Sequence, residues 1–186
     1  MFVFKQFNID RHQVSLLLPE ENQAQALFEV VEADRNELRK WMPWVDDTKS
    51  ERSEAKFIKY IQGQMVAGKV FMLTIAVDNM PVGMIDFHQI NQSDHHAEVG
   101  YWLSQQVQGL GIMTRSLKRL IDYGFNEMKL HKILIQVEAG NTKSSAIPER
   151  LGFIKEAEFK DQIYANGQYR DFVEFGLINK ADGRHS

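Results

Sequence analysis

Apolar residues recur with a helical period through the first third of the chain. After Pro19 they stand three and four residues apart as far as Leu38, which predicts an amphipathic helix. A second stripe follows, with Thr48 and Ser50 both suited to be its N-cap. The apolar positions are Ala24, Leu27, Phe28, Val31 and Leu38 in the first helix, and Phe57, Ile58, Ile61 and Met65 in the second.

The hydrophobic period changes from helical to extended near Val70. Alternating or continuous apolar runs predict strands, Asp78-Asn79 and Asn166-Gly167 predict hairpin turns, and two further helices are expected. The order is strand, two helices, three strands, helix, strand, helix, two strands, which predicts a mixed α/β (α+β) fold with a mostly antiparallel central sheet. The strands are His12–Leu18, Val70–Val77, Pro81–Ile90, Ala97–Leu103, Lys132–Glu138, Phe153–Phe159 and Arg170–Ile178, and the helices are Leu110–Met128 and Thr142–Leu151.

The composition suits one domain over residues 1–186, with 180–186 as a flexible tail. The chain has 186 residues, of which 44% are hydrophobic and 25% charged. Its net charge of −3 gives no electrostatic reason to expect nucleic-acid binding. There are no cysteines, which excludes disulfides, cysteine-ligated zinc and a thiol nucleophile. The longest apolar run, Val70–Val77, is far shorter than the ~20 residues of a membrane span, so we expect a cytoplasmic protein without membrane partners.

A glycine-containing loop between a predicted strand and a long helix is the most informative segment. Glycines let the backbone come close to a ligand, and the free N–H groups of a helix start bind phosphate oxygens. The loop lacks the Gly-Lys-Ser/Thr of a Walker loop and the third glycine of a dinucleotide fingerprint. The alternative to a phosphate-binding loop is a turn in which the glycines serve only to reverse the chain. The residues are Gln106, Val107, Gln108, Gly109, Leu110, Gly111, Ile112, Met113 and Thr114.

The spacing Gln-x-x-Gly-x-Gly, from Gln106 to Gly111, resembles the acetyl-CoA pyrophosphate loop of the GNAT N-acetyltransferase superfamily. A second segment, Asn141–Ser144 followed by Glu149–Phe153, resembles the other acetyl-CoA segment of that superfamily. Three further motifs resemble its RimJ/RimL branch, which acetylates ribosomal-protein N-termini, and the likeness covers nearly the whole chain. They are Trp41–Trp44, Glu98–Trp102 and Gly167–Asp171.

This resemblance implies direct acetyl transfer from acetyl-CoA to an amine, without an acyl-enzyme or a metal. The pantetheine arm is then expected between two splayed parallel strands, Ala97–Leu103 and Lys132–Glu138, with backbone groups as far as Leu103 pairing with it. The loop from Gln106 to Thr114 is expected to bind the pyrophosphate. A possible homodimer is also implied by the family.

Glu98 is the candidate general base. Two-residue alternation places it on the same strand face as His96, Gly100 and Trp102. The resemblance implies a base at this position, and a surface glutamate at a strand edge is the alternative.

Two polar residues of the second segment are candidates for the CoA arm. Asn141 matches the family residue that hydrogen-bonds the arm, and an N-cap for the following helix is its alternative. Ser144 matches a serine near the CoA sulfur and is the candidate acid, because Pro148 stands where many members have a tyrosine. Its alternative is a helix serine that bonds its own backbone.

Trp41 and Trp44 flank Pro43 in the connection between the first two helices, and the fold places this connection beside the acceptor groove. They are candidates for substrate binding, with core packing as the alternative. Three histidines, His88, His95 and His96, lack the spacing of a metal site, so we expect hydrogen-bonded or solvated side chains and no metal.

The sequence therefore predicts an acetyl-CoA-dependent N-acetyltransferase whose acceptor is a protein N-terminal α-amine, such as that of a ribosomal protein. A small amine acceptor (a polyamine, an antibiotic or an amino acid) is the first alternative. A CoA-binding module without catalysis is the second.

Overall fold

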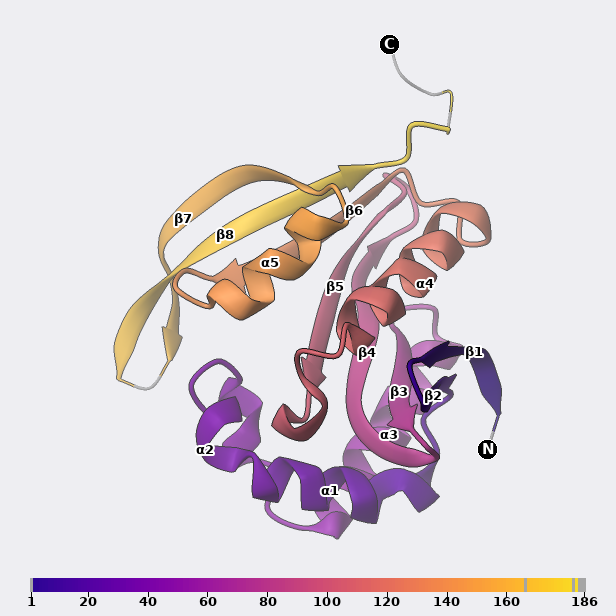
Figure 1. The fold of residues 1–186 in the computed structure, drawn as a ribbon. Helices are drawn as coiled ribbons and strands as arrows, with labels where there is room; N and C mark the ends of the chain where they lie inside the picture. The colour runs from indigo at the N-terminus through magenta and orange to yellow at the C-terminus, as the bar shows by residue number, and fades with distance from the viewer. Residues whose placement is uncertain (1, 166, 182, 184–186) are drawn as a thin grey trace.

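The computed structural model describes residues 2–165, 167–181 and 183. Among them, eight strands form one sheet in the order β1-β2-β3-β4-β5-β6-β8-β7, with β5 and β6 parallel and every other pair antiparallel (Figure 1). The expected mixed sheet is confirmed. The strands are β1 (Val3–Ile9), β2 (His12–Leu17), β3 (Phe71–Val77), β4 (Met80–Asn91), β5 (His96–Leu103), β6 (Lys132–Glu138), β7 (Ile154–Ala165) and β8 (Gln168–Ile178).

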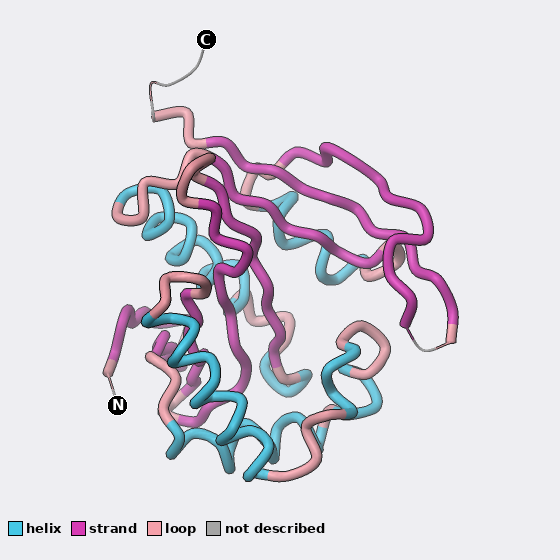
Figure 2. The backbone as a smooth tube through the Cα atoms, turned by 180° about the vertical axis from the view of Figure 1, so that it is seen from behind, coloured by secondary structure: helices cyan, strands magenta, loops and turns pink. Residues whose placement is uncertain are grey.

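Helices lie on both faces of this sheet. In Figure 1, α4 and α5 lie in front of it, and α3 lies behind it and comes to the front in Figure 2. The helices are α1 (Ala24–Ala33), α2 (Arg35–Leu38), α3 (Glu51–Val66), α4 (Ile112–Asn126) and α5 (Thr142–Arg150), with short 3-10 helices η1 (Glu21–Gln23), η2 (Pro43–Asp46) and η3 (Gln105–Val107).

Strand β1 was not expected from the sequence. It pairs only with β2 at the edge of the sheet, and a register shift between Val3 and Lys5 breaks its alternation. Most of its side chains are exposed, so burial imposes no clear apolar pattern on it. Two arginines of α4 reach it: Arg115 donates to the Asn8 carbonyl at 2.9 Å, and the Arg119 guanidinium lies 6.0 Å from the Phe7 ring centre.

Other boundaries also differ from those expected. The first helix ends at Ala33 rather than Leu38, because Asp34 leaves helical geometry and turns its carboxylate to the Gln105 N–H, at 2.8 Å. Strand β7 continues to Ala165 rather than ending at Phe159. Its last part is mostly exposed and contains a register shift, so its sequence shows no alternation of apolar residues. Of the expected last turn and tail, residues 166, 182 and 184–186 lie outside the described residues.

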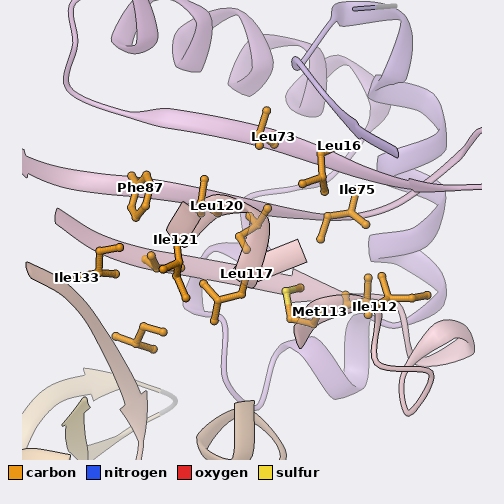
Figure 3. Packing of buried hydrophobic residues seen from close by; sticks show 14 of the residues in the cluster. Leu16, Leu73, Ile75, Phe87, Ile112, Met113, Leu117, Leu120, Ile121 and Ile133 are labelled. Carbon is orange, nitrogen blue, oxygen red and sulfur yellow. The ribbon is translucent and has the colours of Figure 1, made fainter. Parts of the chain in front are cut away.

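The larger core lies between α4 and one face of the sheet (Figure 3). The apolar stripe of α4 points into the sheet, where strands β2 to β6 supply the facing side chains. Each fully buried leucine or isoleucine contributes about 2 kcal/mol by leaving water. The stripe is Ile112, Met113, Leu117, Leu120 and Ile121, and it faces Leu16, Leu73, Ile75, Phe87 and Ile133.

Helices α1 and α3 cover the opposite face. Ile58 and Ile61 of α3 pack with Met72 of β3 and Met84 of β4. Of the two expected N-caps of α3, Ser50 is used: its hydroxyl accepts from the Ser53 N–H at 3.2 Å, within a reciprocal capping box.

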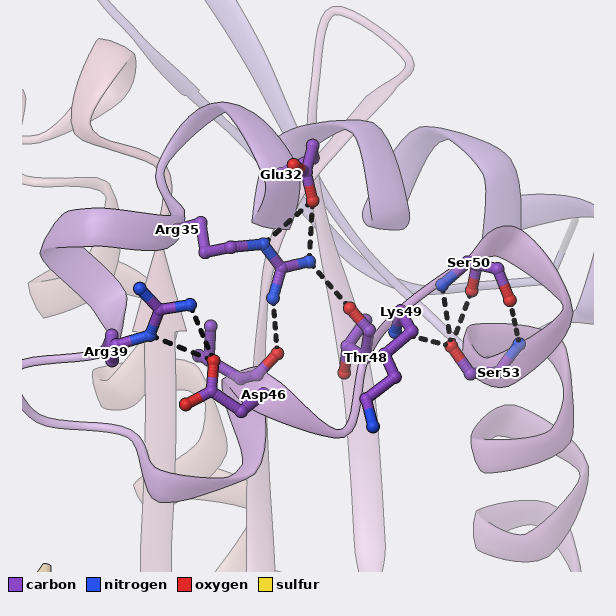
Figure 4. Close-up of polar contacts among 9 residues, drawn as sticks. Glu32, Arg35, Arg39, Asp46, Thr48, Lys49, Ser50 and Ser53 are labelled. Atoms are coloured by element: carbon purple, nitrogen blue, oxygen red, sulfur yellow. Dashed lines mark hydrogen bonds and ion pairs between the residues drawn. The ribbon is translucent and has the colours of Figure 1, made fainter. Parts of the chain in front are cut away.

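Arg35 fixes the connection between α2 and α3 (Figure 4). Its guanidinium donates to the carbonyls of Val45 and Thr48, both at 2.6 Å, and to the Glu32 carboxylate at 2.8 Å. Because these contacts clamp the connection at two points, Trp44 is held in a defined position.

Strands β5 and β6 separate along most of their length. They pair only from His96 to Glu98 on β5, although β5 continues to Leu103 and β6 to Glu138. Over the same length β6 stays paired with β8. The expected splayed parallel pair is confirmed, and Figure 1 shows the two strands diverging.

Candidate functional site

A cavity of about 660 Å³ lies where β5 and β6 separate. Its wall includes Val99 and Tyr101, which pack with the core under α4, and Trp102, which packs with α1 and α3 on the other face. The cavity therefore passes through the sheet. We call the part toward α4 and α5 the α4 side, and the part toward α3 and the Trp41–Trp44 segment the α3 side.

The glycine loop leads from the end of β5 to the start of α4, next to the cavity but not in its wall. Gly109 and Gly111 have φ values of +80° and +78°, the left-handed region that suits glycine. A Cβ built on either glycine meets no atom within 4 Å, so the space above both is open. Gly111 is the N-cap of α4, whose first intrahelical bond runs from the Arg115 N–H to the Gly111 carbonyl.

The side chains of the candidate loop residues divide into two groups. Leu103, Ile112 and Met113 are buried in the core, and Val107 packs against it. Only their backbone atoms can meet a ligand. The exposed side chains are Gln106, Gln108 and Leu110, with Thr114 half-buried. Backbone N–H groups thus dominate this surface, with the positive end of the α4 dipole behind them.

Asn141 and Ser144 both line the cavity on the α4 side. The Asn141 carboxamide accepts from the Ser144 N–H at 3.2 Å, so Asn141 is the N-cap of α5. The Ser144 hydroxyl donates to the Tyr101 hydroxyl at 3.1 Å, which in turn donates to the Ser144 carbonyl at 3.0 Å. Burial raises the pKa of Tyr101 to about 12, while the hydrogen bond with Ser144 lowers it. Tyr101 is therefore a neutral hydroxyl at physiological pH.

Glu98 lies on the α3 side and interacts with His88 across β4 and β5. The His88 Nε2 atom is 3.5 Å from a Glu98 oxygen, and its Nδ1 atom is 2.9 Å from an Asp86 oxygen. Gln89 donates to the other Glu98 oxygen at 3.2 Å. The Glu98 side chain is only 16% exposed, so it is a cavity residue rather than a solvated surface glutamate.

His88 carries a positive charge at neutral pH. Burial alone would lower the pKa of His88, but Asp86 and Glu98 together outweigh it and raise this pKa to about 10. Burial also raises the pKa of Asp86, against the effect of His88. The expectation of a hydrogen-bonded histidine is confirmed for His88.

Gly100 makes room for this cluster. A Cβ at Gly100 would lie 2.9 Å from an Asp86 oxygen and 3.3 Å from the His88 ring. Any side chain here would displace the Asp86–His88 pair, so the lack of space explains why residue 100, between Glu98 and Trp102, is a glycine.

Trp41 and Trp44 both line the cavity on the α3 side and are partly exposed. The Trp44 ring lies 5.8 Å from the ring of Trp102, in a tilted arrangement. Trp44 thus packs on the core edge, as its alternative expected, and it also faces the cavity, while its role in substrate binding stays a prediction.

Among the cavity residues that sequence reasoning did not assign to the site are Glu54, Asp86 and Tyr101, and it did not expect a charge on His88. Strand alternation places Asp86 and His88 on one face of β4, but pairing His88 with Glu98 needs the strand register. A bulge after His88, with Gln89 at φ +48°, shifts this register in a way that no local pattern reports.

Two absences hold for the part of the chain that the structure describes. No group of three or more histidine, aspartate or glutamate side chains is arranged to hold a metal ion there. No helix in it is both long and apolar enough to cross a membrane.

Comparison with known proteins places these features in a family. Residues 14–154 match the family described as Acetyltransferase (GNAT) domain. YdaF of Bacillus subtilis (strain 168) is 30% identical over 168 residues, which cover 90% of this chain and 92% of that protein. The ribosomal-protein-serine acetyltransferase of Escherichia coli (strain K12) is 28% identical over 161 residues, covering 85% and 88%. The structure of RimL, a ribosomal L7/L12 α-N-protein acetyltransferase in complex with coenzyme A, has a TM-score of 0.88 and 25% identity, covering 95% of this chain and 99% of that one.

Proposed function

Since the chain belongs to the GNAT acetyltransferase family, we propose that it transfers the acetyl group of acetyl-CoA to the N-terminal α-amine of a protein, such as a ribosomal protein. The observation that carries this proposal is the cavity through the sheet, which offers a donor and an acceptor a meeting place from opposite faces. Relatives named as ribosomal-protein acetyltransferases support the acceptor class.

The α4 side suits acetyl-CoA. The loop from Gln106 to Thr114 presents backbone N–H groups and the open space above Gly109 and Gly111 to the pyrophosphate. After Glu98, the edge of β5 that faces β6 has no strand partner as far as Leu103, so its backbone groups are available to the pantetheine arm. Asn141 lies on the opposite wall of this gap. Bound acetyl-CoA would supply the thioester, and the polar groups of the chain would hold it in position.

Glu98 is the proposed general base. It lies on the α3 side, where an acceptor amine would enter, and the His88 cation keeps a positive charge beside it. The demand on this base is small, because an α-amine with a pKa of about 7.7–8.0 is already roughly one-tenth neutral at pH 7.

Ser144 is the proposed donor to the departing thiolate. Its hydroxyl lies beside that of Tyr101, which stays neutral at physiological pH and positions Ser144 by hydrogen bonds to its hydroxyl and its carbonyl. Trp41 and Trp44 would form the wall of the acceptor channel.

The test is free-thiol release from acetyl-CoA, measured with a pool of Ser-, Ala- and Met-starting peptides and separately with a pool of small amines. We expect release with the peptides and a mass increase at their N-termini. Release with small amines alone would overturn the acceptor class and move the assignment to metabolite acetylation. Binding of acetyl-CoA without turnover of either pool would favour the non-catalytic module.

Three expectations stay predictions beside this proposal. They are a cytoplasmic location, the absence of nucleic-acid partners and a homodimer. Cell fractionation, a nucleic-acid binding assay and light scattering test them in turn.

A further inference from the structure

Glu54 occupies a position where the helix pattern requires an apolar side chain. It lies on the face of α3 that also carries Ile58 and Ile61, four and seven residues further on, and all three are buried. Glu54 is only 4% exposed. A carboxyl group so placed destabilises the fold unless a partner satisfies it.

Other buried carboxyl groups of the chain have such partners. Asp34 accepts from the backbone N–H of Gln105 at 2.8 Å, and Glu138 pairs with Arg170 at 2.7 Å. For the Glu54 carboxyl, no hydrogen bond or ion pair occurs among the described residues. Burial alone acts on it and raises the pKa of Glu54 to about 7.

The Glu54 side chain lines the cavity on the α3 side. The same cavity wall also carries the apolar side chains of Phe57, Met72 and Met84. Among the described residues of this wall, His88 is the one side chain with a positive charge, and it is already engaged by Asp86 and Glu98. The cavity therefore holds a buried carboxyl that no group among the described residues neutralises.

The strand register gives the depth of the cavity wall between Met72, which lines the same cavity as Glu54, and β5, which carries Glu98. Met72 on β3 pairs with Asp86 on β4, and Asp86 pairs with Gly100 on β5. Two strand spacings, about 10 Å, thus separate the Met72 position from β5. About three residues of extended peptide, or one long aliphatic chain, span that length.

We infer that Glu54 binds a cationic group of the acceptor other than the amine that is acetylated. An ammonium or guanidinium group supplies both the opposite charge and the N–H donors that this carboxyl lacks, and such hydrogen bonds are strong in a dry site. The apolar wall suits the methylene groups that would carry the cation. The inference rests on the proposed transfer to an amine, and it names two sources of the same chemistry: a lysine or arginine near a peptide N-terminus, or the far ammonium of a diamine.

The experiment compares acceptors that differ only in this cation. Wild-type protein, Glu54→Gln and the control Glu51→Gln, an exposed glutamate of the same helix, are assayed with pentapeptides that carry lysine or the isosteric neutral norleucine at the second or third position. 1,6-Diaminohexane and hexylamine form the small-molecule pair. We expect wild type and Glu51→Gln to favour at least one cationic member through KM by 10-fold or more, and Glu54→Gln to reduce that ratio to about one.

Binding of the same compounds to the CoA-loaded protein is measured by calorimetry, so the comparison does not depend on turnover. The inference is overturned if wild type binds both members of every pair equally, if it binds none of them, or if the preference survives in Glu54→Gln. A preference confined to the diamine would support the role of Glu54 and contradict the peptide acceptor. Turnover of peptides with no cationic preference in any pair, the diamine included, would support the peptide acceptor and contradict the role of Glu54.

Discussion

On the α4 side of the sheet, the groups proposed to bind the donor are mainly backbone N–H groups of the glycine loop, whereas on the α3 side of the cavity the available groups are carboxyl, imidazole and indole side chains. The first set comes from one continuous segment, Gln106–Thr114, with Asn141 and Ser144 close by. The second comes from α3, β4, β5 and the Trp41–Trp44 segment, which are far apart in the sequence. A binding surface made of backbone groups keeps its chemistry when side chains are substituted. A binding surface made of side chains changes its chemistry with each substitution. We therefore expect the donor to be constant and the acceptor to be the variable partner.

The largest effect is expected on the α4 side from Gly111→Asp. Aspartate tolerates the left-handed backbone at this position better than most residues, so the fold should survive. Its carboxylate would stand where the pyrophosphate is proposed to bind, and the loss of two charge-assisted hydrogen bonds corresponds to about 4 kcal/mol, or roughly 1000-fold in kcat/KM for acetyl-CoA. Gly63→Asp, at an open position of α3, is the matched control. Wild-type kinetics in Gly111→Asp would contradict the donor site.

The next effect concerns stability and belongs to the α3 side. The pKa of Glu54 is about 7 in the folded protein and ordinarily about 4.5, so the folded state holds this proton more tightly than the unfolded state does. Stability should therefore fall as pH rises from 4.5 to 7, by about 3 kcal/mol, and the loss should be complete above pH 7.

Glu54→Gln should remove this fall, as measured by urea unfolding at pH 5 and pH 7.5. His88, with a pKa of about 10 in the folded protein and ordinarily about 6.5, adds a separate loss that begins near pH 6.5 in both proteins, so Glu54→Gln should keep that part of the fall and lose only the part due to Glu54. An unchanged difference between the two pH values in Glu54→Gln would show that the carboxyl is already neutralised by another group.

A somewhat smaller effect is expected for Glu98→Gln. Loss of a general base lowers kcat by about 100-fold, and the deficit should narrow above pH 8 because more of the α-amine is then neutral. Glu127→Gln, at an exposed position beyond α4, is the control. A deficit that is constant from pH 6 to pH 9 would argue that Glu98 positions the acceptor instead of removing its proton.

The smallest effect is expected for Ser144→Ala. Tyr101 remains as a neutral hydroxyl next to residue 144, so the loss should be about one hydrogen bond, or roughly fivefold in kcat. Ser145→Ala on the same helix serves as the control. A loss as large as that of Glu98→Gln would make Ser144 the principal acid.

The order of helices and strands could be predicted because an element that buries one face has apolar residues spaced with the period of that helix or strand. The α4 stripe and the strands β3 to β6 were found in this way, and their apolar positions are the buried ones. Strand β1 could not be found, because an edge strand with mostly exposed side chains leaves no such period.

The residues on the two sides of the cavity also differed in how well the sequence predicted them. The glycine loop is a local motif, so its place at the start of α4 follows from a short stretch of sequence. The pairing of His88 with Glu98 depends on the register across a bulge, which no local motif encodes. Glu54 lies in the first turn of α3, where an acidic residue is ordinarily favourable to the helix dipole, so its presence there gives no sign in the sequence that it is buried.

The short pairing of β5 with β6 also has a kinetic consequence. Because three residue pairs close the sheet and the rest of the gap is open, the two substrates of the proposed reaction can approach from opposite faces without blocking one another. No covalent form of the enzyme is then needed between two half-reactions. Initial-rate lines measured at several acceptor concentrations should therefore intersect rather than run parallel, and one product should be able to leave while the other is still bound.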